Sequence, residues 1–549
     1  MTISDYEYLA ELLYPDVTMT PEELELRYPP RPLPEGAKVT RFSPSPTGFV
    51  HFGGLYQAVA DERLAHLSGG VFYLRIEDTD TARTVENGVQ SIIRALEEVG
   101  VRFDEGATAD GDKGDYGPYI QSKRIDIYRV YAKKLVREGK AYPCFCTPEE
   151  LADIRARQEA EKADPGYYGK WAVWRDASLE RIREKLEQNA PFVLRFRCED
   201  KPAGKYTFRD YIKGDVEITE NDKDHVIMKS DSIPPYAFAH AVDDHLMRTT
   251  HVVRGEEWLP SLPFHIQLFR ALDFKLPKYC HTALILKQEN GGKRKISKRK
   301  DPEAALDYYI SQGIPLRAFR DYMLTLLNSN FEEWRRANPD ADSDLFPFSP
   351  GKMSVSGALF DADKLNDICK NTVAAMSADE VYGHLVEWAS RFDEGFCKLL
   401  TADEDYAKAI LAIGRGGRKP RKDFGRWSEV KSFVSFFYDE LFERQDTVPA
   451  GFSFDDVREV TERFCSGYDP CDTQDEWFAK VKNVAAECGF CPDMKLYKVS
   501  PDGYKGSIAD VSMFLRVGVT GRMNSPDLYE VMKLLGKDRV VSRLKEFVS

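Results

Sequence analysis

The chain has 549 residues, of which 42% are hydrophobic and 30% are charged, a composition that indicates a soluble globular protein of about three to five domains. It contains no apolar run of about 18 residues and no basic N-terminal leader, so we expect neither a membrane span nor a secretory signal, and its 10 scattered cysteines favour reduced thiols in a cytoplasmic protein. The net charge of −13 argues against a general nucleic-acid coat protein, although a local basic patch can still bind nucleic acid.

The first 37 residues form an extension ahead of the regular pattern. A short helical piece, PEELELR, precedes a proline-rich arm, and we expect this segment to pack on the surface. From residue 38 the stretch KVTRF predicts a strand, LYQAVADERLAHLSGG a helix that stops at Gly69–Gly70, and VFYLRI a buried strand. Apolar residues between Val85 and Val99 predict a further helix, which Gly100 stops. This alternation indicates a parallel α/β sheet, in which ligands bind beyond the carboxyl ends of the strands.

The middle of the chain changes character twice. Residues 121–231 predict an α+β region, with the helix IDIYRVYAKKLVREG and the strands FVLRFR and HVIMK. Residues 232–285 return to α/β character, with the strand HVVRGEEW, the helix SLPFHIQLFRAL and the strand HTALIL. We therefore expect a nucleotide-binding sheet interrupted by an insertion. Beyond residue 286 strand signals thin out and amphipathic helices dominate.

Two separate motifs have the chemistry of phosphate binding. In RFSPSPTGFVHFGG, residues 41–54, one histidine and two glycines stand where a loop enters a helix, so that backbone N–H groups, the helix dipole and the imidazole can meet a polyphosphate. In KRKISKRKD, residues 293–301, two lysines flank Ile-Ser, which suits a loop that holds a pyrophosphate leaving group. Each motif alone is weak, because a glycine turn and a solvated basic loop are both common.

The two motifs together resemble the paired signature of class I aminoacyl-tRNA synthetases. The stretches RIEDTD, GPYIQSKRIDIY, SDSIPPYAFAHAVDDHLM and HVVRGEEW lie between them in an order that closely resembles the glutamyl-tRNA synthetase family. The C-terminal run FLRVGVTGRMNSPDLYEVMKLLGKDRVVSRL is similar to the end of the bacterial-type family members, whereas glutaminyl-tRNA synthetases end in β-barrels.

The resemblance implies a fold and a domain order. It implies a Rossmann-like class I catalytic domain with an inserted α+β acceptor-binding domain, then an α-helical stem-contact region and an all-α anticodon-binding domain. The expected segments are an N-terminal extension 1–37, the first catalytic half 38–120, the insertion 121–231, the second catalytic half 232–285, the stem-contact domain 286–370 and the anticodon-binding domain 371–549, with an optional split near 450.

The implied activity needs a pocket for an amino acid with two carboxylates. Arginine suits bidentate carboxylate recognition, and Arg41 and Arg254 stand at the ends of predicted strands. By the family pattern both contact glutamate, with Arg254 on its side-chain carboxylate, and Glu77 takes the α-ammonium. Ser45 and Tyr236 match positions that complete the pocket with hydroxyl groups.

The family pattern also assigns the nucleotide site. The ATP-contacting positions match His51, Gly53, Gly54, Lys295, Ser297 and Lys298, and positions near the adenosine match Glu257 and Trp258. His51, Lys295 and Lys298 are the predicted catalytic residues, which with Mg²⁺ offset the charge that develops as the glutamate carboxylate attacks ATP. The motif departs from the family pattern in its phenylalanine, HFGG, but keeps the histidine and the first glycine of the pattern.

The cysteines do not match a complete metal site. Cys144 and Cys146 resemble half of a zinc site of some family members, but the other half is missing from the sequence that follows. Tetrahedral zinc needs four ligands, so we expect no zinc and no other metal held by the protein. Cys488 and Cys491 have no partner pair nearby, and we expect them to pack at a helix end.

A basic stretch in the acidic C-terminal half suggests where tRNA binds. The segment GRGGRKPRKDFGR is either a solvated linker or a contact with the anticodon arm. Its cations are Arg415, Arg418, Lys419, Arg421, Lys422 and Arg426.

The expected partners are tRNA(Glu), L-glutamate and ATP, and we expect a monomer. Two other functions remain open at this point. The first is a stand-alone paralogue that glutamylates a modified tRNA base, but such a protein lacks the C-terminal helical region. The second is a non-catalytic tRNA-binding protein, which we would expect to have lost residues such as His51 and Lys295.

Overall fold

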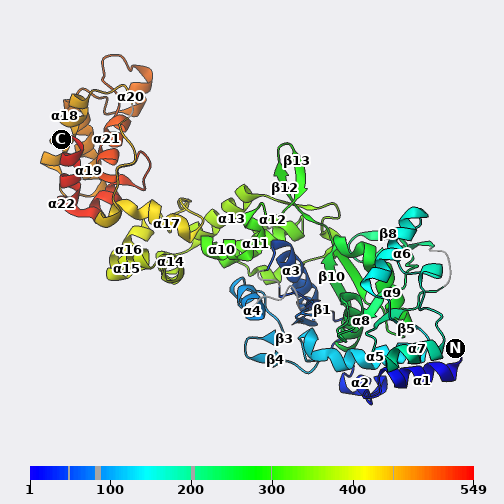
Figure 1. The fold of residues 1–549 in the computed structure, drawn as a ribbon. Coiled ribbons are helices and arrows are strands. Elements are labelled where there is room, and N and C mark those ends of the chain that lie inside the picture. The colour runs from blue at the N-terminus through cyan, green and yellow to red at the C-terminus, as the bar shows by residue number, and fades with distance from the viewer. Residues whose placement is uncertain (47–49, 81–87, 200–203, 298, 449) are drawn as a thin grey trace. The chain divides into compact units, whose positions relative to one another are not determined.

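The computed structural model describes residues 1–46, 50–80, 88–199, 204–297, 299–448 and 450–549, and the statements below concern these residues. The chain divides into two compact units. The first unit comprises residues 1–310 and 320–361, and the second comprises residues 311–319 and 362–549. Figure 1 shows that sheets and helices alternate in the first unit, whereas the second is helical.

A parallel sheet opens the first unit, as the sequence predicts. Strands β1 (Val39–Phe42) and β2 (Val71–Leu74) pair in parallel and are connected by helix α3 (Phe52–His66). Strand β3 (Glu105–Thr108) extends the sheet in parallel, and the short β4 (Gly111–Lys113), which the sequence pattern missed, closes it in antiparallel fashion. Burial along β2 explains its apolar run VFYL, whereas the equally buried β1, VTRF, includes the polar residues Thr40 and Arg41.

The predicted glycine stops are confirmed. Gly69 follows α3 with φ +66°, and Gly100 follows α4 (Gly88–Glu98) with φ +73°, a backbone region that favours glycine. Gly70 is fixed by packing, because a Cβ atom there would lie 1.9 Å from the carbonyl oxygen of Lys38. The start of the second predicted helix, at Val85, lies outside the described residues.

The second half of the α/β core lies directly beside the first. Strands β10 (His251–Gly255) and β11 (Lys278–Thr282) pair in parallel, and α8 (Tyr236–Leu246) and α9 (Leu262–Ala271) flank them. The Thr250 N–H donates to the Val39 carbonyl at 2.9 Å, so β10 runs next to β1. The carboxyl ends of β1 and β10 therefore open at one edge, where ligands of such sheets bind.

The predicted insertion between these halves is an α+β region. Its antiparallel sheet has the order β5-β6-β9, and a separate hairpin is formed by β7 and β8. Its elements are α5 (Ile125–Arg137), β5 (Ala141–Cys144), α6 (Pro148–Ala160), α7 (Leu179–Glu187), β6 (Val193–Phe196), β7 (Lys205–Asp210), β8 (Gly214–Thr219) and β9 (Val226–Met228). Ile218 of the hairpin packs with Val252 and Tyr279 of the parallel strands, which joins the insertion to the sheet.

The N-terminal extension contains two helices instead of one short piece. Helix α1 (Ile3–Leu13) lies along α5, where Lys133 binds Glu11 at 2.6 Å, and α2 (Pro21–Arg27) follows it (Figure 1). Both helices begin with a threonine capping box, which supplies the partners that the first backbone N–H groups need. The extension is therefore packed against the first unit through specific contacts.

A small sheet was missed by the helical prediction beyond residue 286. Strand β12 (Ile285–Glu289) pairs with β13 (Gly292–Lys295) in a hairpin and with β14 (Ala358–Phe360) in parallel. The strands are three to five residues long, too short for a clear alternating pattern. The helices that follow are α10 (Leu306–Gln312), α11 (Leu316–Leu327) and α12 (Phe331–Ala337).

The described part of the second unit is helical, as predicted, around a shared apolar core that includes Leu385, Val430, Phe464 and Phe514. Its helices are α13 (Ala362–Ala375), α14 (Ala378–Phe392), α15 (Glu394–Ala402), α16 (Glu404–Ala412), α17 (Trp427–Val434), α18 (Phe454–Gly467), α19 (Gln474–Glu487), α20 (Met494–Val499), α21 (Ile508–Thr520) and α22 (Leu528–Phe547). Among the described helices, none has the length and apolar character that a membrane crossing requires.

Candidate functional site

The histidine of the first motif begins helix α3. His51 is the N-cap residue, and its Nδ1 accepts a hydrogen bond from the Gly53 N–H at 2.9 Å. Because Nδ1 is the acceptor, the neutral imidazole carries its proton on Nε2 and can donate from there. The Leu306 N–H donates to the Val50 carbonyl at 3.1 Å, which ties this loop to the segment that follows the second motif.

Both phosphate-binding motifs line one cavity of about 300 Å³. The histidine motif contributes the start of α3, the end of β10 contributes the opposite wall, and the end of β13 contributes a lysine. The predicted ATP-site residues along this cavity are His51, Gly53, Gly54, Glu257 and Lys295. Two segments separated by more than 200 residues of sequence thus face the same space.

The loop that contains the second motif is held by a buried aspartate. Arg294 donates to both carboxylate oxygens of Asp301, at 2.6 and 2.7 Å, and the Ser297 N–H donates to the same carboxylate at 2.9 Å. The hydrogen bonds from Arg294 hold the pKa of Asp301 well below its usual range. Ile296 is buried beneath the loop. Asp301, itself part of the motif, therefore fixes the loop. Lys295 in the same motif is exposed and lines the cavity.

Two described residues of the predicted ATP site are not part of this cavity lining. A third predicted residue, Lys298, lies outside the described residues. Ser297 and Trp258 are described but do not line the cavity, and the exposed indole of Trp258 lies 4.5 Å, between ring centroids, from the ring of Tyr236. The structure therefore brings Trp258 to the neighbouring cluster described next.

A second cluster gathers around the carboxyl ends of β1 and β10. Arg41 is buried, with its Nε 3.2 Å from the Asp244 carboxylate and its Nη1 donating to the Val253 carbonyl at 3.4 Å. These contacts lock Arg41 between the two strands. Arg254, at the end of β10, is only 3% exposed, and its guanidinium lies 4.6 Å from the ring centre of Tyr279.

Tyr236 and Glu77 belong to the same cluster. Burial and the Glu77 carboxylate raise the pKa of Tyr236, while Arg254 and Arg41 oppose this shift, so all four groups interact electrostatically. The Glu77 N–H donates to the Pro44 carbonyl at 3.0 Å, which brings the loop that contains Ser45 to this position. Ser45 itself is exposed.

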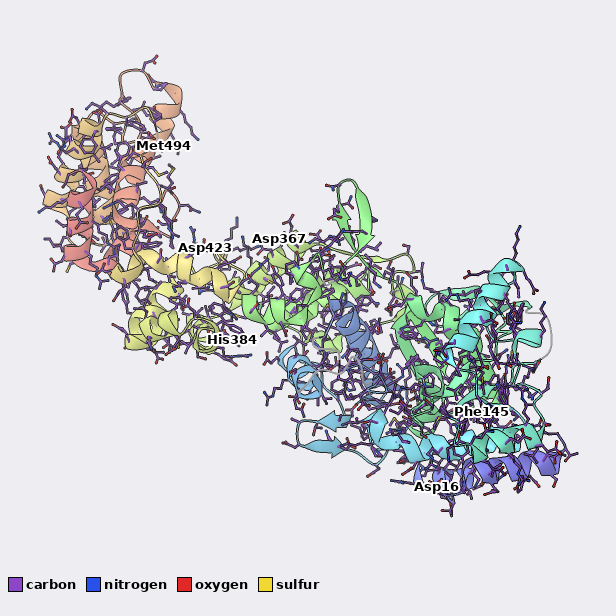
Figure 2. The ribbon with its side chains drawn as sticks, in the orientation of Figure 1. Asp16, Phe145, Asp367, His384, Asp423 and Met494 are labelled. Carbon is purple, nitrogen blue, oxygen red and sulfur yellow. The ribbon has the colours of Figure 1, made fainter. Side chains whose placement is uncertain are left out.

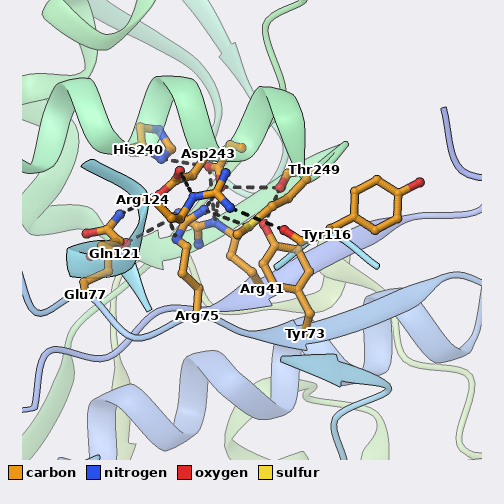
Figure 3. Close-up of polar contacts among 12 residues, drawn as sticks. Arg41, Tyr73, Arg75, Glu77, Tyr116, Gln121, Arg124, His240, Asp243 and Thr249 are labelled. Carbon is orange, nitrogen blue, oxygen red and sulfur yellow. Dashed lines mark hydrogen bonds and ion pairs between the residues drawn. The ribbon is translucent and has the colours of Figure 1, made fainter. Parts of the chain in front are cut away.

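A buried ion network supports these residues and was not found from the sequence (Figure 3). Arg75 lies 2.6 Å from Asp244 and 3.1 Å from Glu77, and Arg124 lies 2.6 Å from Asp243. Buried charges are costly unless paired, so this network fixes one set of positions for its members. The neighbouring Arg41 and Arg75 keep the pKa of Asp244 well below its ordinary value despite burial.

One pair of residues in the sequence signals this network. Asp243 and Asp244 stand side by side in α8, in a helix whose other members are mostly buried. Two adjacent carboxylates that face a protein core require cationic partners. The partners come from three other elements, so only their existence, and not their identity, was predictable.

The cysteine pair is placed at the end of β5, next to Phe145, which Figure 2 labels. The Cys144 and Cys146 sulfur atoms lie 3.4 and 3.5 Å from the Tyr167 hydroxyl. Within the described ranges there is no group of three or more histidine, cysteine, aspartate or glutamate side chains that could hold a metal ion. Cys488 and Cys491 are buried free thiols near the end of α19.

The basic segment of the second unit divides into anchored and exposed cations. Arg415 donates to the carbonyls of Leu411 and Val373, at 2.7 and 2.6 Å, so its guanidinium serves to join helix ends. Arg421 is paired with Asp423, and Arg426 is the N-cap residue of α17. The exposed side chains that remain are Arg418, Lys419 and Lys422.

Comparisons with known proteins agree over the whole chain. The family model for the catalytic domain of class I tRNA synthetases (E and Q) matches residues 38–334, and a model for an anticodon-binding domain matches residues 503–548. The glutamate–tRNA ligase of Acetivibrio thermocellus is 48% identical over 99% of this chain and 100% of its own length, and that of Clostridium perfringens is 45% identical over 99% and 100%.

Solved structures support the same conclusion and the predicted fold class. The glutamate–tRNA synthetase of Elizabethkingia anophelis has a TM-score of 0.72 at 28% identity, covering 93% of this chain and 99% of its own. A glutamate–tRNA ligase of Elizabethkingia meningosepticum, solved in complex with its amino acid, has a TM-score of 0.72 at 27% identity, with the same coverage. The chain therefore belongs to the glutamate–tRNA ligase family of class I tRNA synthetases, as its motifs predicted.

Proposed function

We propose that this protein activates L-glutamate with ATP to form glutamyl-adenylate and pyrophosphate, and then transfers glutamate to the 3′-terminal adenosine of tRNA(Glu). The observation that carries the proposal is the joint cavity of His51 and Lys295, which opens at the same sheet edge as the arginine cluster. A nucleotide and an acidic amino acid can then be held side by side for reaction.

ATP would be held mainly by backbone and cationic groups. The N-terminus of α3 offers the N–H groups of the glycine pair and a positive dipole, and His51 Nε2 offers a further donor. The α-carboxylate of glutamate attacks the α-phosphorus, the bond to the bridging oxygen breaks, and pyrophosphate leaves. Lys295 and the predicted Lys298 stabilise the charge on the leaving group, so no side chain has to take up a proton.

Mg²⁺ would enter with the nucleotide. The described residues contain no carboxylate-rich group that could hold a metal without ATP. Mg²⁺ prefers oxygen ligands and is often bound through substrate phosphates, where it would neutralise part of their charge. Nucleotide binding and stabilisation of the leaving group, as described above, are assigned to side chains and backbone groups of this chain.

Glutamate would be recognised by the buried cluster. Arg254 has no carboxylate within ion-pair distance among the described residues, and its Nη2 has no hydrogen-bond partner there. A buried guanidinium in this state suits the side-chain carboxylate of the substrate. Glu77 would take the α-ammonium, and Arg41, Tyr236 and Ser45 would complete the pocket.

The insertion provides room for the acceptor end of tRNA. A cavity of about 1020 Å³ is lined by Gln158 of α6, by Arg195 of β6, and by Pro235 and Ser261 beside the arginine cluster. A terminal adenosine there could reach the adenylate, which its 2′-hydroxyl attacks. Arg418, Lys419 and Lys422 are the proposed phosphate contacts of the second unit.

Aminoacylation of purified tRNA(Glu) and tRNA(Gln), measured side by side with labelled glutamate, tests this function. We expect base-labile glutamate on tRNA(Glu), and glutamate-dependent ATP–pyrophosphate exchange that requires tRNA. Absence of both reactions would refute the ligase, and glutamate attached only to an anticodon base would favour the paralogue. Charging of tRNA(Gln) as well would define the enzyme as non-discriminating.

A further inference from the structure

Arg254 is held in an unusual way for a buried arginine. Its Nε donates to His281 Nε2 at 3.1 Å, and its Nη1 contacts His265 Nδ1 at 2.9 Å. Buried guanidinium groups are normally paired with carboxylates, yet none lies within ion-pair distance of Arg254 among the described residues. Two imidazoles thus occupy the positions where carboxylates are expected.

Both imidazoles must be neutral to make these contacts. Arginine has donors and no acceptors, so the contacting ring nitrogens of His265 and His281 carry lone pairs. Burial lowers the pKa of both histidines, which favours this neutral form. A neutral acceptor orients the guanidinium but does not cancel its charge.

The ring of His281 is fixed by a hydrogen bond to a buried carboxylate. His281 Nδ1 lies 2.7 Å from the Asp210 carboxylate and donates to it, which leaves its Nε2 as the acceptor for Arg254. The Asp210 carboxylate also accepts from the backbone N–H groups of Ile212 and Lys213, at 2.9 and 2.8 Å. One imidazole therefore stands between the charge of Arg254 and the carboxylate of Asp210.

Two histidines whose rings contact each other, His265 and His240, lie on the other side of the guanidinium. The rings of His265 and His240 lie 4.9 Å apart between centroids, and His240 Nδ1 lies 2.7 Å from Asp244. Asp244 is already engaged by Arg75 and Arg41. His281 thus lies between Arg254 and Asp210, and His265 and His240 lie between Arg254 and Asp244.

We propose that His265 and His281 are specificity-determining positioning residues, which aim Arg254 through neutral acceptors so that its full charge remains for the side-chain carboxylate of glutamate. The inference rests on the proposed function of Arg254. A carboxylate in place of either imidazole would pair with Arg254 internally, and an acidic substrate would then have to displace it. Glutamine, which lacks the negative charge, would not benefit from this arrangement.

The sharpest test compares H265N with H265D in the full-length enzyme. The two side chains have nearly the same size, and both can accept at the position of Nδ1, but only aspartate adds a charge. We expect the KM for glutamate, in the aminoacylation of tRNA(Glu), to be at least about tenfold higher for H265D than for H265N, with the KM for ATP within about twofold. A structural role alone would affect both variants alike.

A second pair, H281Q and H281M, tests the other contact. The two side chains are similar in length and size, but only glutamine offers a strong oxygen acceptor to the Nε of Arg254, since a thioether sulfur accepts weakly. We expect a KM for glutamate several-fold higher for H281M than for H281Q, again with little change for ATP. Because this pair is independent, a folding defect in one pair leaves the other decisive.

Two different failures can be told apart. If the wild-type enzyme forms glutamyl-tRNA but each pair has equal KM values for glutamate, the positioning inference is wrong and the function stands. If the wild-type enzyme forms no glutamyl-tRNA with active tRNA(Glu), the proposed function itself is wrong.

Discussion

The nucleotide cavity and the arginine cluster lie at one edge of the sheet but are built in opposite ways. Lys295 and Glu257 at the cavity are exposed, and the glycine turn contributes Gly53 and Gly54 to its lining. Arg41, Arg75 and Arg254 in the cluster are almost fully buried. A large polyanion can be held by exposed donors, whereas the choice of one acidic side chain requires fixed charges in a dry environment.

This difference predicts that the cluster, and not the cavity, supports the fold. We expect D244N to lower the free energy of unfolding by about 3–5 kcal/mol, because it removes the buried carboxylate that pairs with Arg41 and the carboxylate closest to Arg75. Chemical denaturation measures this change. D215N is the matched control, since Asp215 pairs with Arg209 on the surface, and we expect it to cost less than about 1 kcal/mol. Equal losses of unfolding free energy in D244N and D215N would mean that the buried network stabilises the fold no more than a surface ion pair does.

The largest functional effect is expected at the selecting arginine. R254Q should raise the KM for glutamate by about 100-fold, because charge-assisted hydrogen bonds to the substrate carboxylate are lost, and it should improve the relative use of glutamine. R209Q on the exposed hairpin is the control with the same chemical change. An unchanged KM for glutamate would remove Arg254 from the side-chain pocket.

Substitutions at the cavity should lower the rate of adenylate formation and leave the free energy of unfolding unchanged. We expect K295A to lower kcat for adenylate formation by about 100-fold, with the KM for glutamate within about twofold, since its charge acts on the leaving pyrophosphate. K298A, predicted from the motif alone, should act in the same direction. K293A on the same hairpin is the control. Pre-steady-state formation of adenylate would measure these rates, and wild-type rates would exclude both lysines.

Lowering the pH should reduce the free energy of unfolding through the buried histidine of the arginine cluster. Burial lowers the pKa of His240 to about 4, against 6.5 in the unfolded chain, so between these values only the unfolded state binds the proton. Stability must therefore fall as the pH falls from about 6.5 to about 4, by up to about 1.4 kcal/mol per pH unit for this one group. Denaturation at several pH values should show this slope, and H240Q should reduce it. H384Q, at an exposed histidine of α14, should leave it unchanged.

The smallest effects separate the two kinds of cation in the basic segment. K419Q should weaken tRNA binding a few-fold, reduce the salt dependence by about one counterion and leave stability unchanged. R415Q should instead destabilise the second unit, because its guanidinium bonds to the carbonyls at the helix ends. Filter binding at several salt concentrations, together with thermal melting, distinguishes them. The opposite assignment would follow if R415Q lost only tRNA binding.

The same contrast explains what the sequence could predict. The cavity residues stand in motifs that are local, so the glycine and lysine patterns together with the family resemblance pointed to His51 and Lys295, and both line the cavity. The supporting residues of the cluster are single histidines and carboxylates on separate elements, and only the fold brings His265, His281 and Asp210 together. Arg415 was grouped with exposed cations because its partners, main-chain carbonyls, leave no mark in a sequence.

The secondary-structure predictions also succeeded where the signal is local and failed where it depends on distant parts of the chain. The helix α3 was predicted because its apolar pattern is long and ends at glycines, and the strand β2 because its four residues, VFYL, form an apolar run. The strands β12 and β13 were missed because most of their residues are polar or charged, and β14 because it has three residues and pairs with a strand about 70 positions earlier in the chain. Pairing at that distance is set by tertiary packing.

A crystal structure of the enzyme with a non-hydrolysable glutamyl-adenylate analogue tests the central claim most directly. We expect the group that replaces the phosphate to lie between His51 and Lys295, and the side-chain carboxylate of the glutamyl moiety to contact Arg254 at hydrogen-bond distance. An analogue bound with its carboxylate away from Arg254, or with its nucleotide outside the cavity shared by the two motifs, would contradict the account.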